Sequence, residues 1–136
     1  MISLLDTNVI SELSRKTPDP KVINWINAQE VSDLAISVLT AGEIVYGYLK
    51  LPECRKKDQL RGWFEVDFME WIQDRIFPVT EAVVRDWAAL KATSRPLPVV
   101  DSLLAATAIA ANATLVTRNT KDFAGVKGLK LVNPWK

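Results

Sequence analysis

The chain has 136 residues, of which 49% are hydrophobic and 24% charged, and this balance fits a single domain over residues 1–136. Its 17 Lys and Arg nearly balance its 16 Asp and Glu, so a site for a polyanion must be local. The single cysteine excludes an internal disulfide. The absence of histidine excludes Ser-His-Asp and Cys-His catalysis and His-ligated zinc. Catalysis must therefore use carboxylates, hydroxyls, Lys, Arg or a metal ion held by oxygen atoms.

The chain shows no targeting or membrane signal. Met1 leads directly into ISLLD, without a basic region or a small-residue cleavage site. The most apolar stretch, residues 99–111, is too short to span a bilayer and contains Asp101. We therefore expect a cytoplasmic protein that makes no membrane contact.

Short apolar runs alternate with helical patterns along the chain. Strands are expected over residues 2–5, 34–37, 76–79, 114–117 and 129–132. Helices are expected over residues 9–14, 20–28, 39–49, 56–72, from 80 onward, and over 99–112, which is nearly all apolar and therefore central. This alternation predicts an α/β fold with a central parallel sheet of four to five short strands, flanked by helices on both faces. In such a sheet the site lies beyond the carboxyl ends of the strands.

Three acids stand alone in apolar surroundings. Asp6 follows the first strand, Glu43 is the only charge in residues 34–49, and Asp101 is the only charge in residues 96–117. An unpaired buried carboxylate costs several kcal/mol, so each acid must be protonated, paired, at a wet edge or bound to a metal. Each one alone has a structural explanation, but a parallel sheet would bring all three to the same end.

Clustered carboxylates repel one another, and a hard divalent cation relieves that repulsion. Mg²⁺ and Mn²⁺ prefer oxygen ligands, and the absence of histidine fits such a site. An ion held by acids suits phosphodiester hydrolysis, because it positions the phosphate and activates a water molecule. The segment TRNTKDF after the fourth strand adds a fourth acid, Asp122, and two cations for a substrate phosphate, Arg118 and Lys121.

The motifs LLDTNVISEL, SVLTAGEIVYG and PVVDSLLAATAIAANATLVTRNTKDF, with the terminal NPW, resemble PIN-domain proteins. Within that family they look most like VapC and FitB toxins of type II toxin–antitoxin pairs. The resemblance covers essentially the whole chain and implies a PIN-like three-layer α/β/α fold with an acidic, Mg²⁺-dependent ribonuclease site, in which Mn²⁺ is a substitute.

The resemblance also assigns roles to individual residues. Asp6 of LLDTN and Asp101 of PVVDS match the principal metal-binding aspartates, and Glu43 of TAGEI matches the family glutamate. Asp122 matches a fourth catalytic and metal-binding acid, which other members place where this chain has Asn119. The polar residues that surround the acids and orient them or a water molecule are Thr7, Asn8, Thr117 and Asn119.

The expected partners follow from the same resemblance. They are an RNA substrate, a second copy of the chain in a homodimer, and a cognate antitoxin whose C-terminal segment lies in a groove and blocks the acids. Toxin and antitoxin together could form a higher assembly. RNA beside an acidic site needs a basic rim. Its candidates are Arg15, Lys16, Lys50, Arg55, Lys56, Lys57, Arg95, Arg118 and Lys121. The five tryptophans are expected mostly in the core, with some at an interface.

Three alternatives remain open on the sequence. One is a PIN-domain nuclease for RNA processing or DNA flaps, and another is a non-catalytic PIN scaffold. The third is a receiver-like phosphoacceptor module, which needs an Asp at the end of a middle strand, where this chain has Ser37.

Overall fold

A computed structural model describes residues 1–93 and 96–136. Its sheet contains β1 (Ser3–Leu5), β2 (Leu34–Ser37), β3 (Ile76–Phe77), β4 (Thr114–Val116) and β5 (Lys130–Val132). The helices are α1 (Thr7–Leu13), α2 (Pro20–Asn27), α3 (Val38–Leu49), α4 (Arg55–Gly62), α5 (Met69–Ile72), α6 (Glu81–Thr93), α7 (Val99–Ala110) and α8 (Thr120–Phe123). A 3₁₀ turn, η1 (Val31–Asp33), precedes β2, and a π-helical segment, η2 (Trp63–Phe68), joins α4 to α5.

The five strands form one parallel sheet in the order β3-β2-β1-β4-β5. Its centre is β1, whose Leu4 pairs in register with Ala35 of β2 and Leu115 of β4. Strands in the middle of a parallel sheet are covered on both faces and are therefore almost wholly apolar. The carboxyl ends of β1, β2 and β4 lie at the same end of the sheet, where Asp6 follows β1, Ser37 ends β2 and Thr117 follows β4.

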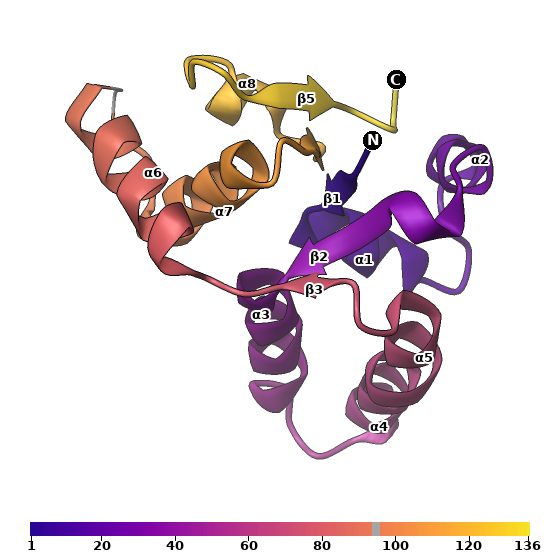
Figure 1. Ribbon diagram of the computed structural model, residues 1–136. Coiled ribbons are helices and arrows are strands. Elements are labelled where there is room, and N and C mark those ends of the chain that lie inside the picture. The colour runs from indigo at the N-terminus through magenta and orange to yellow at the C-terminus, as the bar shows by residue number, and fades with distance from the viewer. Residues whose placement is uncertain (94–95) are drawn as a thin grey trace.

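Two hydrophobic cores lie on the two faces of this sheet. Alternate strand residues point to opposite faces, so Leu5 and Val116 join one core while Leu4 and Leu115 join the other. Helices α1 to α5 contribute to the first core, and α6, α7 and α8 lie over the second, as Figure 1 shows for the α6–α7 pair and for α3, α4 and α5. The predicted three-layer α/β/α fold is confirmed.

Residues 55–72 differ in detail from the expected single amphipathic helix. The stretch is helical throughout, but its middle, Trp63–Phe68, is π-helical. Phe64 and Phe68 stay buried across it, with their rings stacked 5.5 Å apart. Apolar spacing predicts which side faces the core, but it does not distinguish α from π hydrogen bonding. Helix α8 was not predicted as a separate element.

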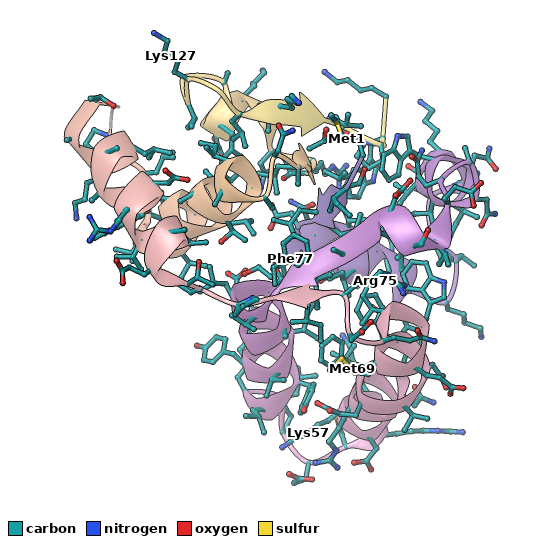
Figure 2. All side chains as sticks on the ribbon, viewed as in Figure 1. Met1, Lys57, Met69, Arg75, Phe77 and Lys127 are labelled. Carbon is teal, nitrogen blue, oxygen red and sulfur yellow. The ribbon has the colours of Figure 1, made fainter. Side chains whose placement is uncertain are left out.

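The helices α3, α4 and α5 with η2 form a part of the molecule that we call the α3–α4 lobe. Two basic residues stabilise it through bonds that the sequence did not indicate. Lys57, a candidate for the basic rim, is instead buried and bonds Glu53 at 2.6 Å, at the end of the α3–α4 lobe far from the sheet (Figure 2). Arg75, beside β3, donates to the carbonyls of Leu34 and Trp71, both at 2.7 Å. Arg75 therefore ties the end of α5 to the start of β2.

The burial of α7 and the tryptophans also qualifies the expectations. Leu104 to Ala108 are buried, as expected for a central helix, but Val99 and Val100 at its start are exposed. All five tryptophans are half-buried. Within the described residues, no helix is long and apolar enough to cross a membrane.

Candidate functional site

An open cavity of about 600 Å³ lies at the carboxyl edge of the sheet. Asp6 reaches it from the end of β1, Glu43 from α3 and Asp101 from the first turn of α7. Thr7, Asn8 and Asn119 also line it. The structure thus brings together three acids that are separated by 37 and 58 residues along the chain.

Asp6 is the most constrained of these acids. It is the N-cap of α1, and its carboxylate accepts hydrogen bonds from the Thr7 backbone N–H at 2.7 Å and the Thr117 hydroxyl at 2.8 Å. Burial raises the pKa of Asp6, the bonds from Thr117 and Thr7 lower it, and the charge of Glu43 raises it again. The net direction is upward, so a positive charge nearby would favour the ionised form of Asp6.

Asp101 is half-buried and feels the other acids. Burial raises its pKa first, and the negative charges of Asp6, Glu43 and Asp122 raise it further. The charges of Asp6, Glu43 and Asp122 therefore favour the protonated form of Asp101.

Hydroxyls and amides fix the acids from the sides. The Thr7 hydroxyl donates to Glu43 Oε1 at 2.6 Å. Asn8 Nδ2 lies 3.2 Å from Thr117 Oγ1 and 3.5 Å from Asp6 Oδ2, and the Asn119 backbone N–H donates to Thr117 Oγ1 at 3.1 Å. All four polar residues expected around the acids therefore lie beside them.

Asp122 and Asn119, the two candidates for the fourth site residue, line different hollows. Asn119 lines the main cavity with the three principal acids, but Asp122 is not among its lining residues. Asp122 lines a neighbouring hollow of about 340 Å³ together with Asp101 and residues 96–98. Asp101 thus stands between the two spaces, and Asp122 acts on the main cavity through its charge.

One acid on the cavity was missed in the sequence. Glu12 lines it and is buried, accepting hydrogen bonds from the Asp19 backbone N–H at 2.8 Å and from Arg15 at 3.2 Å. Glu12 precedes Arg15 by three residues, which is the spacing of an ordinary helical ion pair, so its sequence context does not single it out. Nothing in the local sequence signals that its carboxylate also bonds the turn that leads to α2.

The candidate basic rim is divided by the fold. Arg15 and Arg118 line the acidic cavity, whereas Lys50 and Lys56 line an adjoining groove between α1, α3 and α4. Lys16, Arg55 and Lys121 are exposed elsewhere, and Arg95 lies outside the described residues. The groove has a volume of about 440 Å³ and shares Thr7, Ser11 and Glu43 with the cavity.

The donor set is suited to a hard cation. Carboxylate, hydroxyl and amide oxygens are the ligands that Mg²⁺ prefers. Among the described residues, no three His, Cys, Asp or Glu side chains are gathered closely enough to hold an ion alone. Mg²⁺ usually keeps several water ligands and needs only one or two carboxylates, so the set fits an ion bound partly through water.

Nearly the whole chain is similar to proteins named as a plasmid stability protein, a ribonuclease and a toxin. It is 34% identical to plasmid stability protein StbB of Pseudomonas syringae, covering 98% of both chains. It is 32% identical to VapC ribonuclease Y4jK of Sinorhizobium fredii, covering 98% of this chain and 97% of the relative, and 32% identical to toxin FitB of Neisseria gonorrhoeae, covering 97% of both.

Solved structures and a family model agree with these relatives. The fold matches FitAcB from Neisseria gonorrhoeae with a TM-score of 0.91 and 30% identity, over 98% of this chain and 99% of that one. It matches a toxin–antitoxin complex from Klebsiella pneumoniae with a TM-score of 0.73 and 27% identity, over 98% of each. The PIN domain model matches residues 3–129. The chain therefore belongs to the PIN domain family.

Proposed function

We propose that this protein is a Mg²⁺-dependent endoribonuclease and the toxic component of a toxin–antitoxin pair. The observation that carries the proposal is the convergence of Asp6, Glu43 and Asp101 on one open cavity, where burial first and then the charges of the other acids raise the pKa of Asp101. The ribonuclease and toxin names of its relatives support RNA as the substrate.

Asp6 and Asp101 are the residues that would hold the metal ion, with Glu43 and Asp122 contributing negative charge and contacts through water. An ion held there would supply positive charge for the developing charge on the phosphate and would lower the pKa of an attacking water. This role accounts for two carboxylates whose pKa values are raised in the protein alone, since a nearby cation favours their ionised forms.

The remaining residues position these groups. Thr117 and the Thr7 backbone N–H hold the Asp6 carboxylate, and the Thr7 hydroxyl leaves the second oxygen of Glu43 available to accept a proton from the attacking water. Arg15 and Arg118 give the cavity a cationic rim for the RNA backbone, whereas Lys121 on α8 lies outside its lining. Open access from one side favours single-stranded or looped RNA.

The test is cleavage of single-stranded RNA by purified protein in Mg²⁺. The variants Asp6→Asn and Asp101→Asn keep side-chain shape but lose the charge, and we expect each to lower the initial rate at least about 100-fold, as expected when an electrostatic group in the site is lost. Asp74→Asn is the matched control, because Asp74 is exposed and remote in sequence from the site residues. Undiminished cleavage by Asp101→Asn, or by wild type in EDTA, contradicts the proposal.

A cognate antitoxin is the second part of the proposal, supported by the similarity to a toxin–antitoxin complex. The groove offers Ile10, Ile44, Leu60 and Trp63 to an apolar segment and opens toward the acids at Glu43. A partner arginine entering among the carboxylates would neutralise them as a metal ion does. The toxin would then meet both its RNA substrate and the antitoxin that blocks it in the cytoplasm.

Gly47 gives a direct test of the groove. It lines the groove, and a Cβ added there meets nothing within 4 Å, so the side chain of Gly47→Leu would begin in open space and occupy part of the groove. Gly42→Leu is the control on the same helix, with equally open space and outside the groove lining. We expect Gly47→Leu to lose co-purification with the antitoxin and Gly42→Leu to retain it. Equal retention by both variants removes the groove from the proposal.

A further inference from the structure

The C-terminal turn returns the chain to the acidic cavity. Trp135 lines that cavity beside Asn8 and Arg118. Its backbone N–H donates to Asn133 Oδ1 at 2.9 Å, and Asn133 Nδ2 donates to the Arg118 carbonyl at 3.3 Å. The turn is therefore fastened to the loop that follows β4, which also carries Thr117.

Arg118 and Trp135 form a cation–π pair. The Arg118 guanidinium carbon lies 5.0 Å from the centre of the Trp135 ring, within cation–π range. The half-buried Trp135 also packs against the core beneath α1, so it has rigid support. Arg118 is exposed, and in the part of the chain that the structure describes no acid pairs with it.

The pair is also held in register with the catalytic acids. The Arg118 backbone N–H donates to Asn8 Oδ1 at 3.2 Å, and Asn8 Nδ2 contacts Thr117, which bonds Asp6. A flat group resting on the pair would consequently have a fixed position relative to Asp6.

We propose that Arg118 and Trp135 form a stacking platform for an unpaired RNA base next to the scissile phosphate. This inference rests on the proposed RNA cleavage and adds a positioning role for both residues. Arg guanidinium planes and aromatic rings both stack on bases, and every base offers a flat face, so the platform favours single-stranded RNA without selecting one base. In this arrangement Arg118 contributes its plane as well as its charge.

The variants separate stacking from charge. Arg118→Lys keeps the charge but loses the plane, whereas Trp135→Leu removes the support beneath it. Trp25→Leu is the matched control, because Trp25 is also half-buried against the same core but does not line the cavity. Thermal melting of each variant identifies any general loss of folding.

The experiment compares a short single-stranded RNA with copies that carry one abasic residue at successive positions. Binding is measured by fluorescence anisotropy in EDTA, and kcat and KM are measured in Mg²⁺. For wild type and Trp25→Leu, we expect one abasic position to weaken binding and raise KM about tenfold. For Trp135→Leu and Arg118→Lys, the intact RNA should show that same weakening, with no further loss at the abasic position.

The outcomes distinguish the platform from the proposed activity. Equal binding of intact RNA and every abasic copy by wild type overturns the platform, as does an unchanged abasic penalty in Trp135→Leu. An Arg118→Lys variant that behaves as wild type leaves Arg118 as a phosphate contact and also overturns it. Base-sensitive binding with no cleavage in Mg²⁺ supports the platform and rejects the nuclease.

Discussion

Thr117 is the residue on which the ionisation of Asp6 depends most directly. Its hydroxyl bond is the largest influence that lowers the pKa of this buried carboxyl. Thr117→Val removes the bond while keeping the side chain's volume, so the pKa of Asp6 should rise further. We expect the acid limb of the pH–rate profile to move to higher pH and the Mg²⁺ requirement to rise about tenfold. Thr117→Ser keeps the hydroxyl, and a profile like that of Thr117→Val in this variant would contradict the account.

Asp101 should carry a stability cost when no metal is bound. Its pKa is raised in the folded protein, so the folded state is favoured below the ordinary carboxyl pKa and loses that stability as pH rises through the raised value. Asp101→Asn does not titrate there. In EDTA the free energy of unfolding of the variant should exceed that of wild type at pH 7, by less than about 1 kcal/mol because Asp101 is only half-buried. At pH 4 the two proteins should be nearly equally stable. A variant less stable than wild type at pH 7 contradicts this prediction.

Asp122 tests how far the site extends. Because it lines the neighbouring hollow and reaches the main cavity through its charge, Asp122→Asn should slow RNA cleavage less than Asp101→Asn does. The measurement is the initial rate at saturating Mg²⁺ for both variants. Equal losses would place Asp122 among the direct metal ligands.

At the scale of elements, the α3–α4 lobe depends on contacts to η2. Tyr48 of α3 is buried and donates its hydroxyl to Glu65 of η2 at 2.6 Å. Tyr48→Phe leaves the ring in place and removes the bond, which should lower the free energy of unfolding by about 1 kcal/mol. Urea unfolding measures this, with Tyr46→Phe as control because Tyr46 is exposed. A Tyr48→Phe variant as stable as the control shows that the bond does not support the lobe.

This lobe and the neighbouring strand β2 show why some elements could be predicted from the sequence and others could not. β2 was expected over residues 34–37 and is Leu34–Ser37, because a short apolar run with a capping Ser37 has a strong local signal. The π-helical turn at Trp63–Phe68 and the burial of Lys57 depend on tertiary packing. Local periodicity contains no information on either.

At the scale of the whole molecule, the sheet topology brings acids that are isolated in the sequence to one cavity. Charge isolation identified Asp6, Glu43 and Asp101, and the parallel sheet explains their convergence. Glu12 and Trp135 were not identified as cavity residues. Glu12 lines the cavity from α1, where its spacing to Arg15 is that of an ordinary ion pair, and Trp135 lines it from a C-terminal turn that Asn133 bonds to Arg118.

Assembly is a further prediction at this scale. Exposed apolar side chains occur on α3 at Tyr46 and Leu49 and at the start of α7 at Val99 and Val100. Such side chains on a folded surface are often covered by a partner. We expect a homodimer by size-exclusion chromatography with light scattering. A monomer at high concentration contradicts that expectation.

Acids that are distant in sequence should form one divalent-cation site in this protein. The test is to titrate purified protein with Mn²⁺ and to measure the free ion by electron paramagnetic resonance. We predict that wild type and Asp74→Asn bind Mn²⁺ alike, and that Asp6→Asn and Asp101→Asn bind it at least about tenfold more weakly. Binding by Asp6→Asn and Asp101→Asn with wild-type affinity would show that these carboxylates do not hold the ion.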